Sequence, residues 1–133
     1  MLTFFEVYSS MQKILIIDDD EQMRNLLCRT MEYAGFNVEA ASDGRKGLRL
    51  FEESPYDLVI TDLIMPEQEG METITFLRKN HPEVKIIAIS GGGRIGPDTY
   101  LPAALELGAD RAFAKPFPID DIINAVKELL GAT

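Results

Sequence analysis

The residues of this sequence that could do chemistry each follow a short apolar stretch. They are three carboxylates, one hydroxyl and one amine: Asp18, Asp19, Asp62, Ser90 and Lys115. If the apolar stretches are parallel strands, these side chains meet at the carboxyl edge of one sheet, where such sheets bind ligands. Two carboxylates about 4 Å apart repel by roughly 4 kcal/mol at an effective dielectric of 20. A cation is therefore expected among them, and an all-oxygen ligand set beside a phosphate favours Mg²⁺.

Such a site suits phosphoryl transfer, which depends mainly on positioning and charge neutralisation. Asp62 could be the nucleophile, because carboxylates form acyl phosphates. Lys115 and the metal could neutralise the phosphoryl oxygens, and Ser90 could donate a hydrogen bond to one of them. The new charge would draw Ser90 and Lys115 inward and reshape the loops that follow them. Plainer interpretations exist: a helix-capping pair at Asp18 and Asp19, turn residues at Asp62 and Ser90, and a surface lysine. The shared edge disfavours them.

Strand-like and helix-like segments alternate along the chain and could position these residues. Short apolar runs predict strands over 13–18, 37–41, 56–62, 84–90 and 109–114. A period near 3.6, with caps and stops, predicts helices over about 21–34, from a cap at Ser42 or Asp43 to about 51, and over 71–80, 100–107 and 118–130. Five such units predict an α/β fold, a parallel sheet with helices on both faces.

Composition narrows the class of protein. The 133 residues suit one domain, 46% of them are apolar, and the net charge is −9. That charge disfavours nucleic acid and anionic membranes as partners. One cysteine, and the lack of an apolar run near 20 residues, favour a cytoplasmic protein without a membrane segment. Residues 1–11 are expected to be a loosely ordered extension and residues 12–131 the domain, with no output domain after it.

Four pieces of the sequence together resemble the receiver domains of two-component response regulators. They are residues 14–20 (Ile-Leu-Ile-Ile-Asp-Asp-Asp), residues 57–70 (Asp-Leu-Val-Ile-Thr-Asp-Leu-Ile-Met-Pro-Glu-Gln-Glu-Gly), Ser90, and Lys115-Pro116-Phe117. The resemblance runs from about residue 13 to residue 130. It implies a flavodoxin-like, doubly wound five-stranded sheet in the order 2-1-3-4-5, and a cis peptide before Pro116.

The same resemblance implies a role for each site residue. Asp62 would be the phosphoacceptor, and Ser90 and Lys115 would be the phosphate-binding switch residues. A Mg²⁺ ion would be held by Asp18, Asp19, Asp62 and the backbone carbonyl of Ile64. No other cofactor is implied.

The resemblance also implies partners and a route for the signal. A histidine kinase or a histidine phosphotransfer protein would donate the phosphoryl group to Asp62. The domain is not expected to be an enzyme beyond its own phosphorylation and slow dephosphorylation. Slow hydrolysis is expected because Ile64 and Gly92, two residues after Asp62 and Ser90, offer no side chain to orient a water. The signal would leave by onward phosphotransfer, or by contact through the fourth helix (100–107), the fifth strand and the last helix.

Two features depart from the family pattern. An aromatic residue often stands three positions before the lysine and turns inward on activation, but Ala112 stands there. Phe113 follows it, and alternation along a strand points this ring to the opposite face. The loop that begins Gly91-Gly92-Gly93 looks about three residues longer than usual and is expected to be mobile, because glycine costs most to order. We expect this loop, rather than an aromatic ring, to report phosphorylation.

Two other functions are compatible with parts of the pattern. Phosphatases of the haloacid dehalogenase type also combine aspartates, a hydroxyl and a lysine on a similar sheet. They require an Asp-x-Asp-x-Thr/Val pattern, which Asp18-Asp19-Asp20-Glu21-Gln22 lacks, and no cap domain is present in the sequence. A receiver-like binding module that is never phosphorylated is the other alternative. Loss of partner binding on Asp62→Ala, with the fold intact, would favour the phosphorylated switch over that module.

Overall fold

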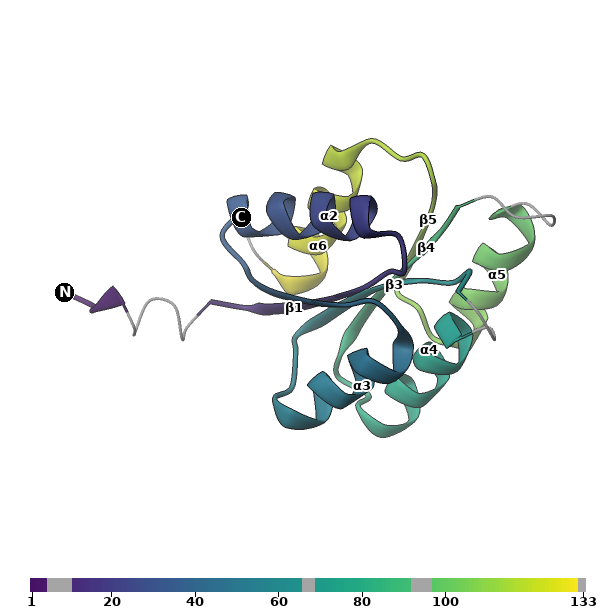
Figure 1. Ribbon diagram of the computed structural model, residues 1–133, viewed down its shortest axis with the longest axis horizontal. Helices are drawn as coiled ribbons and strands as arrows, with labels where there is room; N and C mark the ends of the chain where they lie inside the picture. The colour runs from purple at the N-terminus through teal and green to yellow at the C-terminus, as the bar shows by residue number, and fades with distance from the viewer. Residues whose placement is uncertain (5–10, 66–68, 92–96, 132–133) are drawn as a thin grey trace.

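The computed structural model describes residues 1–4, 11–65, 69–91 and 97–131, and within them strands and helices alternate (Figure 1). The strands are β1 (Lys13–Ile17), β2 (Asn37–Ala41), β3 (Leu58–Asp62), β4 (Lys85–Ser90) and β5 (Arg111–Ala114). The helices are α2 (Glu21–Tyr33), α3 (Gly44–Glu53), α4 (Glu69–Asn80), α5 (Pro97–Leu107) and α6 (Ile119–Leu130). Residues 5–10 lie outside the described part, so the loosely ordered extension stays a prediction.

All strand pairs are parallel, and the sheet order β2-β1-β3-β4-β5 confirms the predicted topology. The register brings the strand ends to a common edge. Asp62 lies opposite Ile89, and Ser90 lies opposite Ala114. The residues directly after β1 and β5 therefore come to the same edge as the last residues of β3 and β4.

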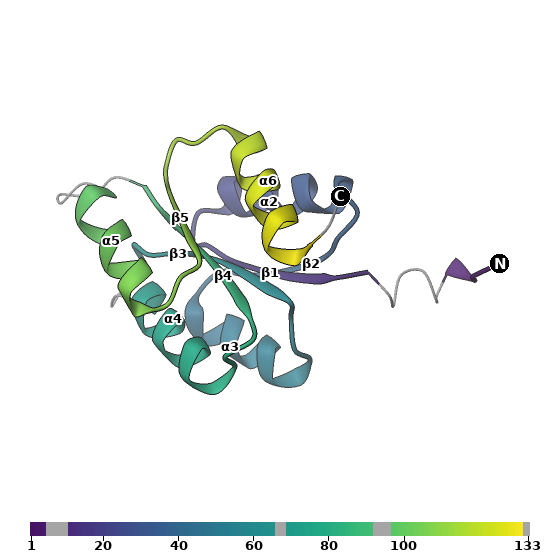
Figure 2. The same ribbon diagram turned by 180° about the vertical axis from the view of Figure 1, so that it is seen from behind.

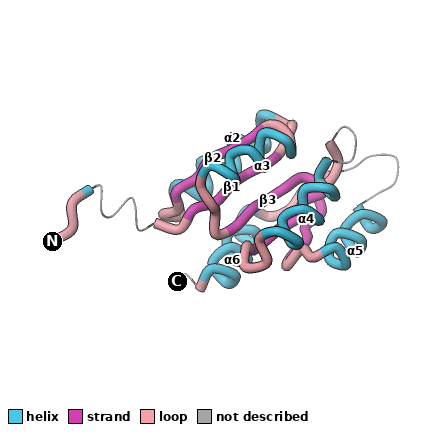
Figure 3. The backbone as a smooth tube through the Cα atoms, turned by 90° about the horizontal axis from the view of Figure 1, so that it is seen from below, coloured by secondary structure: helices cyan, strands magenta, loops and turns pink. Residues whose placement is uncertain are grey.

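Helices cover both faces of the sheet, with α2 and α6 on one side and α3, α4 and α5 on the other (Figures 1 and 2). Viewed from below, α3 lies at the end of the α3–α4–α5 layer that is nearest β2, and α5 lies at the opposite end of this layer (Figure 3). Alternate residues of each central strand enter different cores: Leu58 and Ile60 pack with α2 and α6, whereas Val59 packs with α3 and α4. This two-sided burial explains the continuous apolar runs in the sequence. No helix in the described ranges combines the length and apolar character of a membrane span.

Aspartate side chains cap the first two helices that follow strands. Asp20 accepts hydrogen bonds from the backbone N–H groups of Gln22 and Met23 at the start of α2. Asp43, rather than Ser42, caps α3, through the backbone N–H of Lys46. Such caps satisfy N–H groups that have no partner within the helix, so they fix where the chain turns away from β1 and β2.

Two helices begin earlier than the sequence indicated. The prediction that α5 begins near residue 100 was wrong, because it starts at Pro97, a residue that suits a first helical turn. The loop that precedes α5 therefore has three fewer residues than the sequence indicated. Helix α4 begins at Glu69 rather than at residue 71, so Gly70, read as a loop residue, is helical. Pro118 precedes α6 as its N-cap instead of opening the helix.

The amino-terminal edge of β4 and β5 is fastened by one side chain, Arg78 of α4. Its guanidinium donates to the carbonyl oxygens of Pro82 (2.8 Å), Val84 (3.0 Å) and Gly108 (2.7 and 3.1 Å). It also forms an ion pair with Asp110 at 3.0 Å. One planar group thus joins the end of α4, the start of β4 and the connection from α5 to β5.

Candidate functional site

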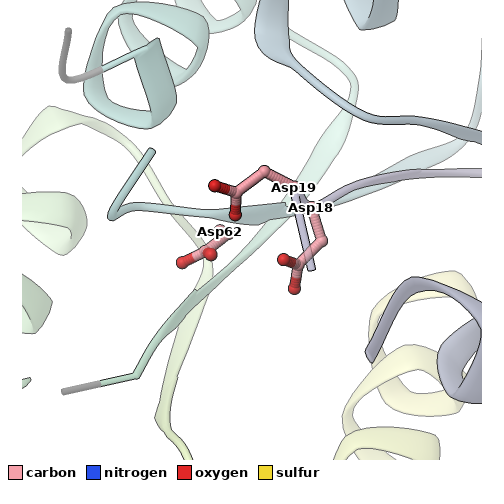
Figure 4. Close-up of side chains that lie close together, drawn as sticks. All are labelled: Asp18, Asp19 and Asp62. Carbon is pink, nitrogen blue, oxygen red and sulfur yellow. The ribbon is translucent and has the colours of Figure 1, made fainter. Parts of the chain in front are cut away.

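The three predicted acidic residues lie together at the carboxyl edge of the sheet (Figure 4). Asp18 and Asp19 follow β1, and Asp62 is the last residue of β3. One carboxylate oxygen of each lies within 4.8 Å of the others, an arrangement we call the acidic cluster. Asp18 and Asp62 are buried, whereas Asp19 is exposed. The cluster is therefore partly sealed by the protein and open to solvent on the side of Asp19.

Asp18 is held at both its carboxylate and its backbone. The backbone N–H of Asp20 donates to Oδ1 at 2.9 Å, and the Lys115 amine donates to Oδ2 at 3.0 Å. The Arg24 guanidinium donates to the Asp18 carbonyl oxygen at 2.8 Å. These bonds give the fully buried residue a set orientation and compensate part of the cost of burying its charge.

The cost of burying the charge of Asp62 is compensated by fewer and longer hydrogen bonds. The backbone N–H of Ile64 donates to Oδ1 at 3.1 Å, and the Lys115 amine lies 3.4 Å from Oδ2. Burial, and then the negative charge of Asp18, raise the pKa of Asp62 to about 6, although Lys115 and the Ile64 N–H act in the opposite direction. Burial acts to lower the pKa of Lys115, but its bonds to Asp18 and Asp62 and their charges together raise it. Without a further cation, Asp62 therefore takes up a proton at a higher pH than an ordinary aspartate does.

Ser90 contributes a buried hydroxyl donor to the site. Its hydroxyl is fully buried and has no hydrogen-bond partner in the described part of the chain. Its carbonyl accepts from the Lys115 N–H at 2.8 Å, which places the two residues side by side on neighbouring strands. A buried polar group without a partner costs about 1–3 kcal/mol. Such a group at a ligand-binding edge indicates a site that is completed by a ligand.

The segment around Lys115 agrees with several expectations. The peptide between Lys115 and Pro116 is cis, as predicted. Ala112 packs with the core on the α3–α5 side, whereas Phe113 packs on the opposite side with Phe117, at 6.2 Å between ring centroids. The prediction that Phe113 points away from the usual aromatic position is confirmed.

Other predictions fall partly or wholly outside the described residues. Gly92 and Gly93 belong to residues 92–96, so the mobility of that loop and its proposed role as a reporter stay predictions. Ile64 is described, and its backbone N–H binds Asp62. Its carbonyl as a metal ligand likewise stays a prediction.

Two residues of the site were missed by sequence reasoning. Arg24 lies one turn into α2 and reaches back to Asp18. Gly70 lets α4 approach β3, because a Cβ there would stand 2.2 Å from the carbonyl oxygen of Asp62 and 2.6 Å from Cα of Leu63. The position of Arg24 six residues after Asp18 was the available signal for the first contact. The second contact depends on the placement of α4 and had no local signal.

The donors present fit a hard divalent cation. Three carboxylates supply oxygen atoms at close range, and one of them, that of Asp19, is exposed to solvent. Magnesium prefers such partial protein coordination. The described residues place no histidine or cysteine in the cluster, so the donor set does not favour zinc.

Comparison with known proteins agrees with the geometry. The profile of the response regulator receiver domain matches residues 14–127. The transcriptional regulatory protein CpxR of Escherichia coli (strain K12) is 37% identical over 120 residues, which are 90% of this chain and 50% of CpxR. The response regulator receiver protein CpdR of Brucella abortus (strain 2308) is 31% identical over 92% of this chain and 99% of its own length. The chain thus spans about half the length of CpxR and nearly all of CpdR.

Solved structures give the same result. A receiver domain protein from Clostridium thermocellum superposes with a TM-score of 0.82 at 30% identity, over 91% of this chain and 95% of its own. A CheY-like receiver domain protein from Methanospirillum hungatei JF-1 superposes with a TM-score of 0.83 at 30% identity, over 92% and 95%. With the sheet order and the acidic cluster in the expected places, the chain belongs to the response regulator receiver domain family.

Proposed function

We propose that the chain is a phosphoacceptor switch of a two-component or phosphorelay system, with Asp62 as the residue that is phosphorylated. The observation that carries the proposal is the buried Ser90 hydroxyl, which has no partner among the described residues and lies beside a lysine amine that already contacts Asp62. A phosphoryl group on Asp62 would supply the acceptor that Ser90 lacks and an anion for Lys115. The donor is proposed to be the phosphohistidine of a histidine kinase or of a histidine phosphotransfer protein.

Asp18, Asp19 and Asp62, with the carbonyl of Ile64, would hold Mg²⁺. When bound, the ion would neutralise charge on the phosphoryl oxygens. Asp62 would serve both as a metal ligand and as the phosphoacceptor, because its carboxylate is one of the three in the acidic cluster.

The chain's own residues would carry the transfer. A carboxylate oxygen of Asp62 attacks phosphorus, a P–O bond forms, and the P–N bond to the donor imidazole breaks with its electron pair left on nitrogen. Lys115 keeps its bond to Asp18 while its amine moves from the Asp62 carboxylate to a phosphoryl oxygen. The Ser90 hydroxyl donates to another. The strand ends that carry both residues are thereby drawn toward Asp62.

Hydrolysis of the acyl phosphate is proposed to be slow. Asp62 is 4% exposed, and the residues two positions after Asp62 and Ser90 in the sequence are an isoleucine and a glycine, which cannot orient water through a polar side chain. The domain would act on no separate substrate, so it would serve as a switch rather than as an enzyme. A phosphate half-life of seconds after removal of the donor would contradict this part of the proposal.

The signal is proposed to leave through the face formed by α5, β5 and α6, as protein contact or onward phosphotransfer. Support comes from Leu105 and Leu107 of α5, which are large apolar side chains left exposed next to β5. A cytoplasmic location, without direct binding to nucleic acid or membrane, is part of the proposal and is supported by the acidic composition.

Acetyl phosphate with Mg²⁺, followed by intact mass measurement, tests the proposal. One added phosphoryl group is expected on the wild type and none on Asp62→Asn or in the presence of a chelator. No added mass on a folded wild type would leave two explanations, which beryllofluoride distinguishes because it mimics the phosphoryl group without hydrolysing. Binding of beryllofluoride would indicate fast hydrolysis, and no binding would favour a receiver-like module that is not phosphorylated.

A further inference from the structure

A second charged site lies beside the acidic cluster and has the opposite sign. A cleft of about 430 Å³ opens past the end of β2, with Arg24 on the α2 side and Lys46 and Arg49 on the α3 side. Ser42 and Leu50 complete much of its lining, and none of the lining residues is acidic. We call this the basic cleft. Helices α2 and α3 lie on opposite faces of the sheet (Figure 1), and β2 is its edge strand, so the cleft opens directly to solvent.

The basic cleft is unusual for this chain because acidic residues outnumber basic ones, 22 to 13. An anion approaching the protein is repelled by the overall charge of −9. Three cationic side chains in one cleft without a carboxylate in its lining create a local exception. An anion that binds here would therefore be bound by these residues and not by the field of the whole protein.

The donors in the cleft are only partly used. Arg24 has five N–H donors, one of which is held by the Asp18 carbonyl, so its guanidinium is oriented in advance. The Arg49 guanidinium makes no hydrogen bond or ion pair within the described ranges and is exposed. Lys46 donates to Ser42 Oγ at 3.2 Å and lies 3.9 Å from Asp43, a loose contact for a side chain that is 61% exposed. Each cation can accept a new anionic partner at little cost.

We propose that the basic cleft binds a phosphate-bearing small molecule. Two arginines and a lysine supply the forked and point-like donors that phosphate oxygens accept, and the Ser42 hydroxyl can add another. The volume lies within the range of small-molecule sites, about 300–1,000 Å³. The cleft is lined by seven residues, far fewer than the roughly 20–30 residues that each side of a stable protein interface contributes. Leu50 offers an apolar surface for the organic part of the ligand.

The proposal goes beyond the phosphoacceptor function and is tested without magnesium or phosphodonor. Inorganic pyrophosphate, with ADP as a second probe, is titrated into the metal-free chain at physiological ionic strength, and amide shifts and heats are recorded. Binding is expected in wild type and equally in Asp62→Asn, with amide shifts centred on residues 40–50 and on α2. Arg49→Ala and Lys46→Ala are each expected to weaken binding about tenfold, the loss typical of a charge-assisted hydrogen bond.

Arg45→Ala is the matched control. Arg45 is exposed on the same helix but lines a different pocket, between α3 and α4. The Arg45→Ala substitution removes the same charge as Arg49→Ala and is expected to leave the affinity for pyrophosphate unchanged. An equal loss from Arg45→Ala would show attraction by surface charge alone and overturn the proposal. The absence of binding at probe concentrations on the order of 10 mM would also overturn the proposal. Tighter binding of tetraglutamate than of pyrophosphate would overturn it as well, because it would indicate that the cleft binds an acidic protein segment.

Discussion

Replacement of Asp62 by asparagine should stabilise the metal-free protein at neutral pH. Burial raises the pKa of this carboxyl from 3.8 to about 6, so the folded protein binds the proton more tightly than the unfolded chain does. The resulting stability is fully present below about pH 4 and is lost as pH rises through 6. The difference between these two pKa values corresponds to about 3 kcal/mol. The contact with Lys115 is already included, because that amine lowers the pKa of Asp62.

Asparagine cannot ionise, so Asp62→Asn removes this pH dependence. Of the roughly 3 kcal/mol, about 2 kcal/mol is lost between pH 4.5 and pH 7.5. The remainder is lost below pH 4.5, because the carboxyl of the unfolded chain is already largely ionised at that pH. Urea unfolding in EDTA at the two pH values measures it. The free energy of unfolding of the variant, relative to wild type, should be about 2 kcal/mol more favourable at pH 7.5 than at pH 4.5.

When the unfolding free energy of the wild type is subtracted from that of the variant, the contributions of titrating groups that the substitution leaves unchanged cancel. A relative stability equal at both pH values, within about half a kcal/mol, would refute the reasoning that burial destabilises the ionised Asp62. Mg²⁺ provides the second arm of the experiment. It should raise the unfolding midpoint of the wild type, because it binds the folded state, and should have a much smaller effect on Asp62→Asn.

Three further substitutions test separate contacts, and urea unfolding measures the stability of each. Ser90→Ala should leave the metal-free stability unchanged or raise it by up to about 3 kcal/mol, because the buried hydroxyl has no partner among the described residues, while intact mass shows less phosphorylated protein. A loss above about 2 kcal/mol would show that the hydroxyl has a partner in the folded protein. Gly70→Ala should cost about 2 kcal/mol or more, since its Cβ would overlap the Asp62 carbonyl, and wild-type stability would contradict that approach. Arg78→Lys should cost about 2–4 kcal/mol, because an ammonium cannot reproduce the forked contacts; full rescue by lysine would show that charge alone suffices.

Much of the fold could be predicted because burial on both faces leaves a local signature. Residues 14–17 of the first strand are apolar throughout, since alternate residues enter two different cores. The same logic located Asp18 and Asp62, which interrupt apolar runs at the point where a parallel sheet meets solvent. Their convergence follows from topology alone, without knowledge of any side-chain contact.

The features that were missed depend on contacts between distant segments. Gly70 looked like a loop residue, because only the position of α4 against β3 reveals that no side chain fits there. The start of α5 was placed too late, since the glycines before it obscured the helical turn that Pro97 opens. The bond from Arg24 to Asp18 joins residues only six apart, but it requires the exact turn between β1 and α2.

The fastening of β4 and β5 by Arg78 has a consequence for where foreign sequence can be introduced. Connections between a helix and the next strand usually tolerate inserted residues, since lengthening a loop costs little conformational entropy. The connection from α5 to β5 is an exception. Gly108 and Asp110 are both bound by Arg78, and Asp110 also accepts from the backbone N–H of Ile86 at 2.8 Å. A tag or sensor inserted between these two residues would pull apart the ends of two strands whose other ends carry Ser90 and Lys115.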